Sequence, residues 1–158
     1  PAFSGMFLSL VMFGFLGGVT GVIQGMMQLN MMIHNTLRVV GHFHATVVAG
    51  TTVAFMGLAY YVIPLIMRRE LISRRLATWQ PYVYGSGLFL LIAGMMLSGD
   101  IGIPRRSWDI SAGGFASISD ITLGLVGIGA IVAVVGGGMF VYIAVFSLLF
   151  GKDLRKQS

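Results

Sequence analysis

The chain has 158 residues, of which 56% are hydrophobic and only 9% are charged, and its mean hydropathy is +0.90. Soluble domains carry about 25% charged residues, so most of this surface must face lipid or other apolar protein. Cysteine is absent, which excludes disulfides, iron–sulfur clusters and thiolate metal sites. The net charge of +5 comes from basic residues in short loops between apolar runs. It therefore indicates orientation in a membrane and no nucleic-acid partner.

Four apolar stretches follow one another along the chain, and each is long enough to cross a bilayer, which takes about 20 residues. They cover approximately 2–27, 39–67, 81–98 and 121–150. We therefore predict an all-α membrane protein with four transmembrane helices, forming a single transmembrane unit over 1–158. The chain begins with Pro1, and we expect it to be trimmed or part of something larger. The first stretch lacks a basic leading region and a small-residue cleavage site, so it is not interpreted as a signal peptide.

Basic residues are distributed unevenly between the connections. The second and fourth stretches are followed by Arg68, Arg69, Arg74, Arg75, Lys152, Arg155 and Lys156. The opposite side holds Arg38, Arg105, Arg106, Asp100, Asp109 and Asp120. Because Lys and Arg accumulate on the cytoplasmic side, both termini are predicted to be cytoplasmic. The loops 27–38 and 99–120 are then predicted to face outside.

All three histidines lie close together, at His34, His42 and His44, where the second span begins. An α-helix turns about 100° per residue, so His42 and His44 point about 200° apart and cannot share one metal on that helix. They can serve two separate sites, and neutral imidazole is an axial ligand of haem iron. We expect Gly41 to leave room for a macrocycle. The alternative is a set of interfacial histidines bonded to loop carbonyls.

A basic pair, Arg105-Arg106, follows Pro104 in the loop on the same side as the histidines. Guanidinium groups bind carboxylates as bidentate forks, so this pair can neutralise haem propionates. Trp108 can pack at the same interface. An ordinary basic loop is the alternative, but the orientation rule offers no explanation for arginines on the outer side.

Three motifs in order resemble subunit I of the haem–copper oxygen reductases. They are Gly17-Gly18-Val19-Thr20-Gly21, then His34-Asn35-Thr36 with Val40-Gly41-His42-Phe43-His44, and Ile103-Pro104-Arg105-Arg106. The resemblance covers the whole chain as the last four of twelve core helices, nine to twelve. Asn35 stands where many members have Asp, which resembles the B-type, ba3-like members and weakens the case for magnesium near His34.

The resemblance implies a role for each matching residue. His42 is implied to be the proximal ligand of the high-spin haem, where oxygen binds, and His44 an axial ligand of the low-spin haem. His34 is implied to lie near the propionates of the high-spin haem, and Arg105 and Arg106 to hold propionates. Arg38 stands where an aromatic residue is expected, and contact with a propionate or with a partner subunit are both open.

The implied reaction is the four-electron reduction of oxygen to water with proton translocation, by a cytochrome c oxidase in a prokaryotic plasma membrane. Copper B needs three further histidines and the low-spin haem one more, which this chain lacks. The implied partners are therefore the remaining N-terminal part of subunit I, subunit II, and an electron donor, which is cytochrome c, another small carrier or a quinol. A quinol oxidase, a nitric-oxide reductase and a non-catalytic four-helix membrane subunit are the alternatives.

Overall fold

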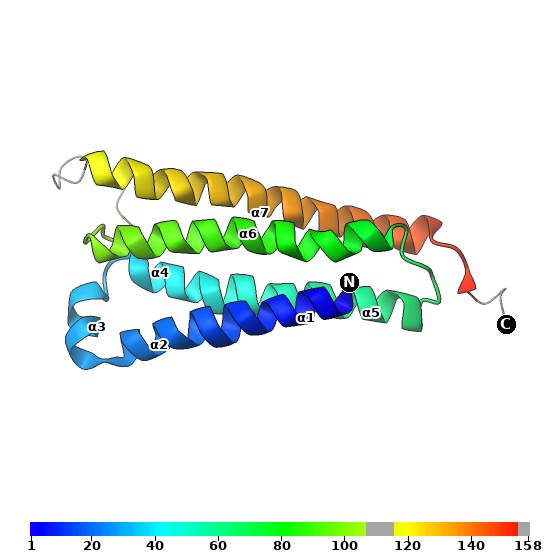
Figure 1. Ribbon diagram of the computed structural model, residues 1–158, viewed down its shortest axis with the longest axis horizontal. Helices are drawn as coiled ribbons and strands as arrows, with labels where there is room; N and C mark the ends of the chain where they lie inside the picture. The colour runs from blue at the N-terminus through cyan, green and yellow to red at the C-terminus, as the bar shows by residue number, and fades with distance from the viewer. Residues whose placement is uncertain (107–115, 155–158) are drawn as a thin grey trace.

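A computed structural model of the protein describes residues 1–106 and 116–154, with the side chains at 116 and 117 left aside. Long helical rods run antiparallel as two hairpins that pack against each other (Figure 1). Four helices are long and apolar enough to cross a membrane, so the predicted all-α, four-span architecture is confirmed. Four residues discussed above lie outside the described part of the chain, namely Trp108, Asp109, Arg155 and Lys156.

The first rod is a continuous helical span, Ala2–Gly25. It comprises α1 (Ala2–Leu10), the π-helical segment η1 (Val11–Gly17) and α2 (Gly18–Gly25). It ends where Met26 takes extended backbone angles, φ −74° and ψ 119°. The short helix α3 (Met27–Ile33) then crosses the end of the molecule (Figure 1).

The second rod, Leu37–Ile66, carries the two neighbouring histidines. It comprises α4 (Leu37–Phe43), the π-helical segment η2 (His44–Thr51) and α5 (Thr52–Ile66). Its start is set by Thr36, whose side chain accepts a hydrogen bond from the backbone N–H of Arg38 and so satisfies one of the free donors of the first turn. His42, the first of the two histidines, therefore lies just over one turn inside a capped helix.

The second hairpin consists of α6 (Arg74–Asp100) and α7 (Ala116–Phe150). Helix α6 extends beyond the apolar stretch 81–98 at both ends. Its first turn is capped by the Ser73 side chain, which accepts from the N–H of Leu76. Beyond its last turn, Gly102 has a φ of 89°, a left-handed conformation that glycine adopts without a Cβ penalty.

Glycines at heptad spacing bring α6 and α7 into backbone contact. A Cβ added at Gly87 or Gly94 of α6 would overlap the backbone of α7, and one added at Gly129 or Gly136 would overlap α6. Small residues replace the hydrophobic effect as the means of helix association within a bilayer, because they allow close packing. This seam makes α6–α7 one rigid hairpin.

The first and second rods contact each other through their two π-helical segments, η1 and η2. The Ser9 hydroxyl donates to the Gly50 carbonyl at 2.7 Å, and a Cβ at Gly50 would meet the side chain of Phe13. A π-helical turn widens the helix and often occurs beside functional sites. Because η2 begins at His44, the widened turn starts at one of the candidate ligands.

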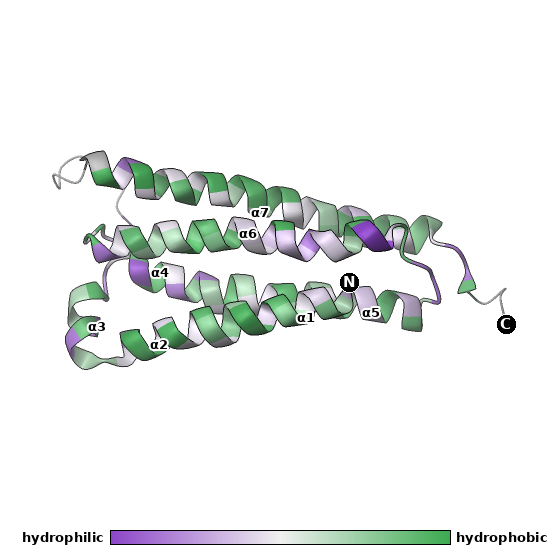
Figure 2. Cartoon of the chain, in the orientation of Figure 1, coloured by the Kyte–Doolittle hydropathy of each residue, from purple (hydrophilic) through white to green (hydrophobic). Residues whose placement is uncertain are grey.

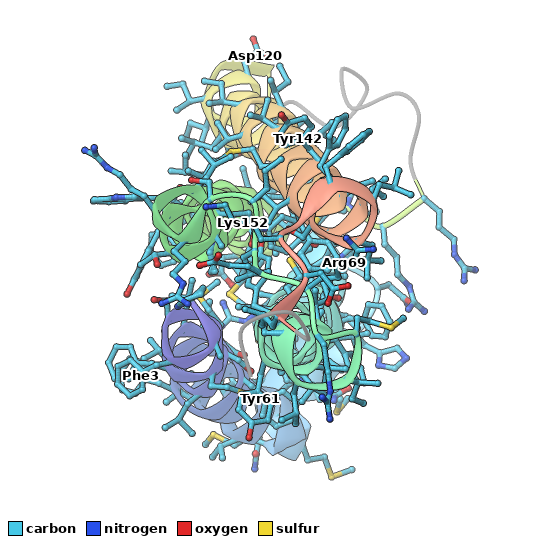
Figure 3. All side chains as sticks on the ribbon, turned by 90° about the vertical axis from the view of Figure 1, so that its right-hand side faces the viewer. Phe3, Tyr61, Arg69, Asp120, Tyr142 and Lys152 are labelled. Atoms are coloured by element: carbon cyan, nitrogen blue, oxygen red, sulfur yellow. The ribbon has the colours of Figure 1, made fainter. Side chains whose placement is uncertain are left out.

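Apolar residues dominate the middle of every rod, whereas polar residues gather at the two ends (Figure 2). Seen along the bundle, Arg69 and Lys152 lie over one end, and Phe3 and Tyr61 project outward (Figure 3). At this end the loop between α5 and α6 is tied to the end of α7. Arg69 donates to the Gly151 carbonyl at 2.9 Å, and the Glu70 N–H donates to the Lys152 carbonyl at 3.0 Å.

Candidate functional site: a pair of imidazoles at one end of the bundle

The segment that contains the histidines and the Pro-Arg-Arg segment meet at the end of the bundle opposite the termini. The Leu37 N–H donates to the Ile103 carbonyl at 3.0 Å, and the Arg105 N–H donates to the Asn35 carbonyl at 2.8 Å. The Arg105 guanidinium also donates to Asn35 Oδ1 at 3.3 Å. The structure therefore places Arg105 beside the residue that follows His34, on the same end as the start of α4.

His42 points from α4 toward α2. Its Nδ1 lies 2.9 Å from the hydroxyl of Thr20, which also lies 2.7 Å from the Leu16 carbonyl and 3.1 Å from the Gly17 carbonyl. When the hydroxyl donates to either carbonyl, its oxygen accepts from His42, and Nδ1 is the protonated nitrogen. The lone pair of Nε2 is left for another partner. This is the tautomer that a metal-ligating imidazole requires.

His44 reaches the same state by a different contact. Its Nδ1 lies 2.8 Å from the backbone carbonyl of Val40, one turn earlier in the same helix. A carbonyl only accepts, so Nδ1 must donate and Nε2 again carries a free lone pair. Both neighbouring histidines thus present the same unprotonated nitrogen.

The two imidazoles lie on different faces of the second rod. The backbone through Phe43 (φ −59°, ψ −41°) and His44 (φ −65°, ψ −35°) is α-helical, so the separation of about 200° given by α-helical periodicity applies between His42 and His44. A Cβ added at Gly21 would lie 3.1 Å from Cε1 of His42. Gly21 is therefore the glycine that leaves room beside this ring.

The prediction for Gly41 is wrong. A Cβ at Gly41 would meet Met96 Cγ at 2.9 Å and Met95 Cβ at 3.2 Å, both on α6. This glycine lets α4 pack closely on α6. Helical spacing explains the error, because a residue adjacent to His42 points about 100° away from it.

The other predicted site residues lie in the loops at this end. His34 is exposed, and its Nδ1 donates to Asn30 Oδ1 at 3.1 Å. Arg105 is half-buried, whereas Arg106 is exposed and has a φ of 64°. Among residues 1–106 and 116–154, no three His, Asp or Glu side chains converge as a metal site. The resemblance assigns the copper ligands to another part of the protein.

Comparison with known proteins identifies the family. The family described as Cytochrome C and Quinol oxidase polypeptide I matches residues 2–139, which is most of the chain. The chain belongs to this family. The motifs around His42 and Arg105 fall inside the matched range.

Two curated relatives and one solved structure agree with the match. Subunit 1 of the cytochrome c oxidase of Thermus thermophilus is 28% identical over 99% of this chain and 28% of its own length. A probable quinol oxidase subunit 1 of Staphylococcus haemolyticus is 33% identical over 58% of this chain and 14% of its own length. A heme-copper terminal oxidase dimer contains a chain that is 27% identical, with a TM-score of 0.84 over 96% of this chain and 27% of that chain. The chain therefore spans less than a third of the length of these relatives.

Membership of the haem–copper oxidase subunit I family implies haem and copper cofactors in the complete enzyme. The described residues fit haem on two counts. Both imidazoles present a free Nε2, which is an axial donor for haem iron. Arg105 lies at the same end of the bundle, where its guanidinium can pair with the carboxylate of a haem propionate. Asn35 and the Thermus relative are both consistent with a resemblance to the B-type members.

For three residues of the site, no role was predicted from the sequence. Thr20 and Gly21 lie in a motif that the resemblance includes, but nothing in the sequence indicates that they contact His42. Asp100 forms an ion pair with Arg38, from helices far apart in the chain. Helical periodicity describes which residues share a face of one helix, and it contains no information about the partner helix.

Proposed function

We propose that this chain is the part of a terminal respiratory oxidase that supplies one axial ligand to each of two haems. His42 ligates the high-spin haem, at which oxygen binds, and His44 ligates the low-spin haem. The complete enzyme is a cytochrome c oxidase that reduces oxygen to water, consuming four electrons and four protons per oxygen molecule, and couples this to proton translocation. Haem iron supplies the electron transfer and the oxygen binding when it is bound.

One observation supports this proposal more than any other. Two imidazoles two residues apart each hold Nδ1 against an oxygen that can accept its proton, at 2.9 Å for His42 and 2.8 Å for His44. Each therefore holds Nε2 unprotonated, and the two nitrogens are on different faces of one helix. His34 also bonds through Nδ1, but only His42 and His44 lie on one helix long and apolar enough to cross a membrane, as two axial ligands of separate haems would.

The protein's own groups perform three tasks in this proposal. Thr20 and the Val40 carbonyl fix the tautomer and the ring orientation of the two ligands, which also raises the basicity of Nε2. Arg105 and Arg106 hold propionates at the end of the bundle. Apolar side chains of the helices exclude water around the sites, which strengthens the electrostatic interactions within them.

The partners follow from what this chain does not contain. The copper ligands and the second ligand of the low-spin haem come from the remaining N-terminal part of subunit I, and subunit II completes the complex. The site lies toward the outer side of a prokaryotic plasma membrane, with both termini cytoplasmic. Cytochrome c is the proposed donor. Relatives of both kinds, cytochrome c oxidase and quinol oxidase, match this chain.

Oxygen consumption by the purified complex tests the proposal. The complex is expected to consume oxygen with reduced cytochrome c, and His42→Ala and His44→Ala are each expected to abolish the activity. A control is Arg75→Ala, because Arg75 is exposed and lies at the opposite end of the bundle. Consumption with a quinol but not with cytochrome c would contradict the proposed donor. Full activity of His42→Ala would contradict the proposed site.

A further inference from the structure

A cation that is largely shielded from solvent lies on the same helix as both proposed haem ligands. Arg38 precedes His42 by one turn, and its side chain is only 14% exposed. It forms an ion pair with Asp100, at the end of α6, whose side chain is 45% exposed. The cation is thus shielded from solvent far more than its counter-ion.

The position of Arg38 is fixed from three directions. Its carbonyl accepts from Gln24 Nε2 at 3.2 Å, so the first rod contacts it. A Cβ at Gly99 would overlap the backbone of Arg38, so α6 lies directly against it. The N–H of Leu37, the preceding residue, donates to the Ile103 carbonyl at 3.0 Å. The charge therefore has a defined place in the fold.

Keeping Arg38 here costs free energy in three ways. Desolvating a charge is unfavourable, and an ion pair seldom repays that cost fully. The first turn of a helix carries a partial positive charge, which disfavours a cation. Nε of Arg38 is buried, and no hydrogen-bond partner for it lies within residues 1–106 and 116–154. Packing alone would be served better by an apolar side chain.

We infer that Arg38, held in place by Asp100, is a charge that sets the reduction equilibrium of both haems at once. A fixed positive charge favours the reduced form of nearby iron, because reduction lowers the positive charge of the metal. Solvent screens the half-exposed Asp100 more than it screens Arg38, so their effects do not cancel. By helical periodicity Arg38 lies about 40° from His42 and about 120° from His44 around the helix, one to two turns away, so both sites lie within its field. This inference depends on the proposed function.

Redox titration of the purified complex tests the inference, with the two haems followed separately by their absorption. Arg38→Gln is expected to lower the midpoint potential of both haems, and Asp100→Asn to raise both. The Arg38→Gln shift corresponds to roughly a four- to fifteenfold change in the reduction equilibrium constant, which is the effect of one charge about 10–20 Å away at an effective dielectric constant of about 20. The Asp100→Asn shift is expected to be smaller, because solvent screens Asp100 more than Arg38. The double variant is therefore expected to stay below the wild-type values, but by less than Arg38→Gln, and Arg38→Lys, which keeps the charge, to stay within about twofold of the wild type.

The matched control is the ion pair between Arg74 and Glu70, at 3.5 Å, at the other end of the bundle, with the Arg74 side chain 77% exposed. Arg74→Gln and Glu70→Gln are expected to change neither potential. If Arg38→Gln and Asp100→Asn match these controls, shift the potentials in the same direction, or affect one haem only, the inference is overturned. If the wild-type complex contains no haem, the proposed function itself fails, so the two failures are distinguishable. If Arg38→Gln does not assemble, Asp100→Asn and Arg38→Lys decide the question.

Discussion

The two ends of the bundle use their polar side chains in opposite ways. At the end near the termini, Tyr60 donates to Gln80 Oε1 at 2.9 Å, and Gln80 Nε2 donates to the Gly136 carbonyl at 3.0 Å and approaches Met56 Sδ at 3.3 Å. At the other end, His42 and His44 each use Nδ1 and leave Nε2 for another partner. The first network is closed, and the second is open.

A closed network joins helices, whereas an open one leaves an acceptor nitrogen for a binding partner. Buried polar groups in proteins are generally hydrogen-bonded, as those of the closed network are. The Tyr60–Gln80 network links α5, α6 and α7, and it accounts for its own polar atoms. In the proposed function, the half-buried histidines bind groups from outside this chain. Substitutions that alter the histidine contacts should therefore change cofactor binding, and substitutions within the closed network only stability.

Thr20→Val should have the largest effect in this comparison. It removes the oxygen that accepts from His42 Nδ1, so the ring loses its fixed tautomer and orientation. Loss of such a supporting contact typically costs about 10- to 100-fold in metal affinity or activity. Haem retained by the purified complex, measured against time in the presence of a haem acceptor, should show faster loss of the high-spin haem.

Thr46→Val is the matched control for this substitution. The Thr46 hydroxyl donates only to the backbone carbonyls of His42 and Phe43, at 3.3 and 3.1 Å, and valine keeps the methyl group that contacts Gly17. High-spin haem should be retained as in the wild type. Equal retention in Thr20→Val and Thr46→Val would show that the Thr20 contact does not support a ligand.

Gly99→Ala should destabilise the complex by about 1–3 kcal/mol, because the added methyl group overlaps the Arg38 backbone and forces α4 away from α6. The thermal midpoint of the purified complex measures the effect. Gly124→Ala is the control, since a Cβ there meets nothing within 4 Å in the described part of the chain. Indistinguishable midpoints for the two variants would argue against the close crossing of α4 and α6.

Arg105→Gln should weaken haem binding by roughly 1 kcal/mol, or about fivefold, because a partly exposed ion pair is screened by solvent. Haem titration into the haem-depleted complex measures this change. Arg75→Gln replaces an exposed arginine at the opposite end and should leave the affinity unchanged. An Arg105→Gln complex with wild-type haem affinity would remove the propionate role.

Tyr60→Phe should have the smallest effect, a loss of about 1 kcal/mol in stability with unchanged haem spectra. The hydrogen bond from the Tyr60 hydroxyl to Gln80 is lost, but no residue proposed to bind a haem is altered. Tyr61→Phe is the control, because Tyr61 is 58% exposed. Any shift of a haem band in Tyr60→Phe would show that the closed network is not purely structural.

The sequence was sufficient for the features that depend on one helix alone. Apolar run length predicted four spans, which the structure confirms. Periodicity separated His42 from His44, because the angle between neighbours on one helix does not depend on what surrounds it. The family resemblance is confirmed by the match over residues 2–139.

Features that depend on contacts between helices could not be predicted. The choice of Gly21 over Gly41 beside His42, the Thr20 contact and the Arg38–Asp100 pair all arise from how α4 packs on α2 and α6. Close crossings at glycine set these contacts, and the positions of the glycines alone do not say which helices cross. The sidedness of the bundle and the roles of His34 and Arg106 stay predictions.

The central claim is that His42 and His44 ligate two different haem irons, and reduced-minus-oxidised spectra with and without carbon monoxide test it most directly. In His42→Ala, the carbon-monoxide-binding haem is expected to be lost while the low-spin band is retained. In His44→Ala, the low-spin band is expected to be lost while carbon monoxide still binds. A complex in which one substitution removes both signals equally, or in which His42→Ala keeps its carbon-monoxide-binding haem, would contradict the account.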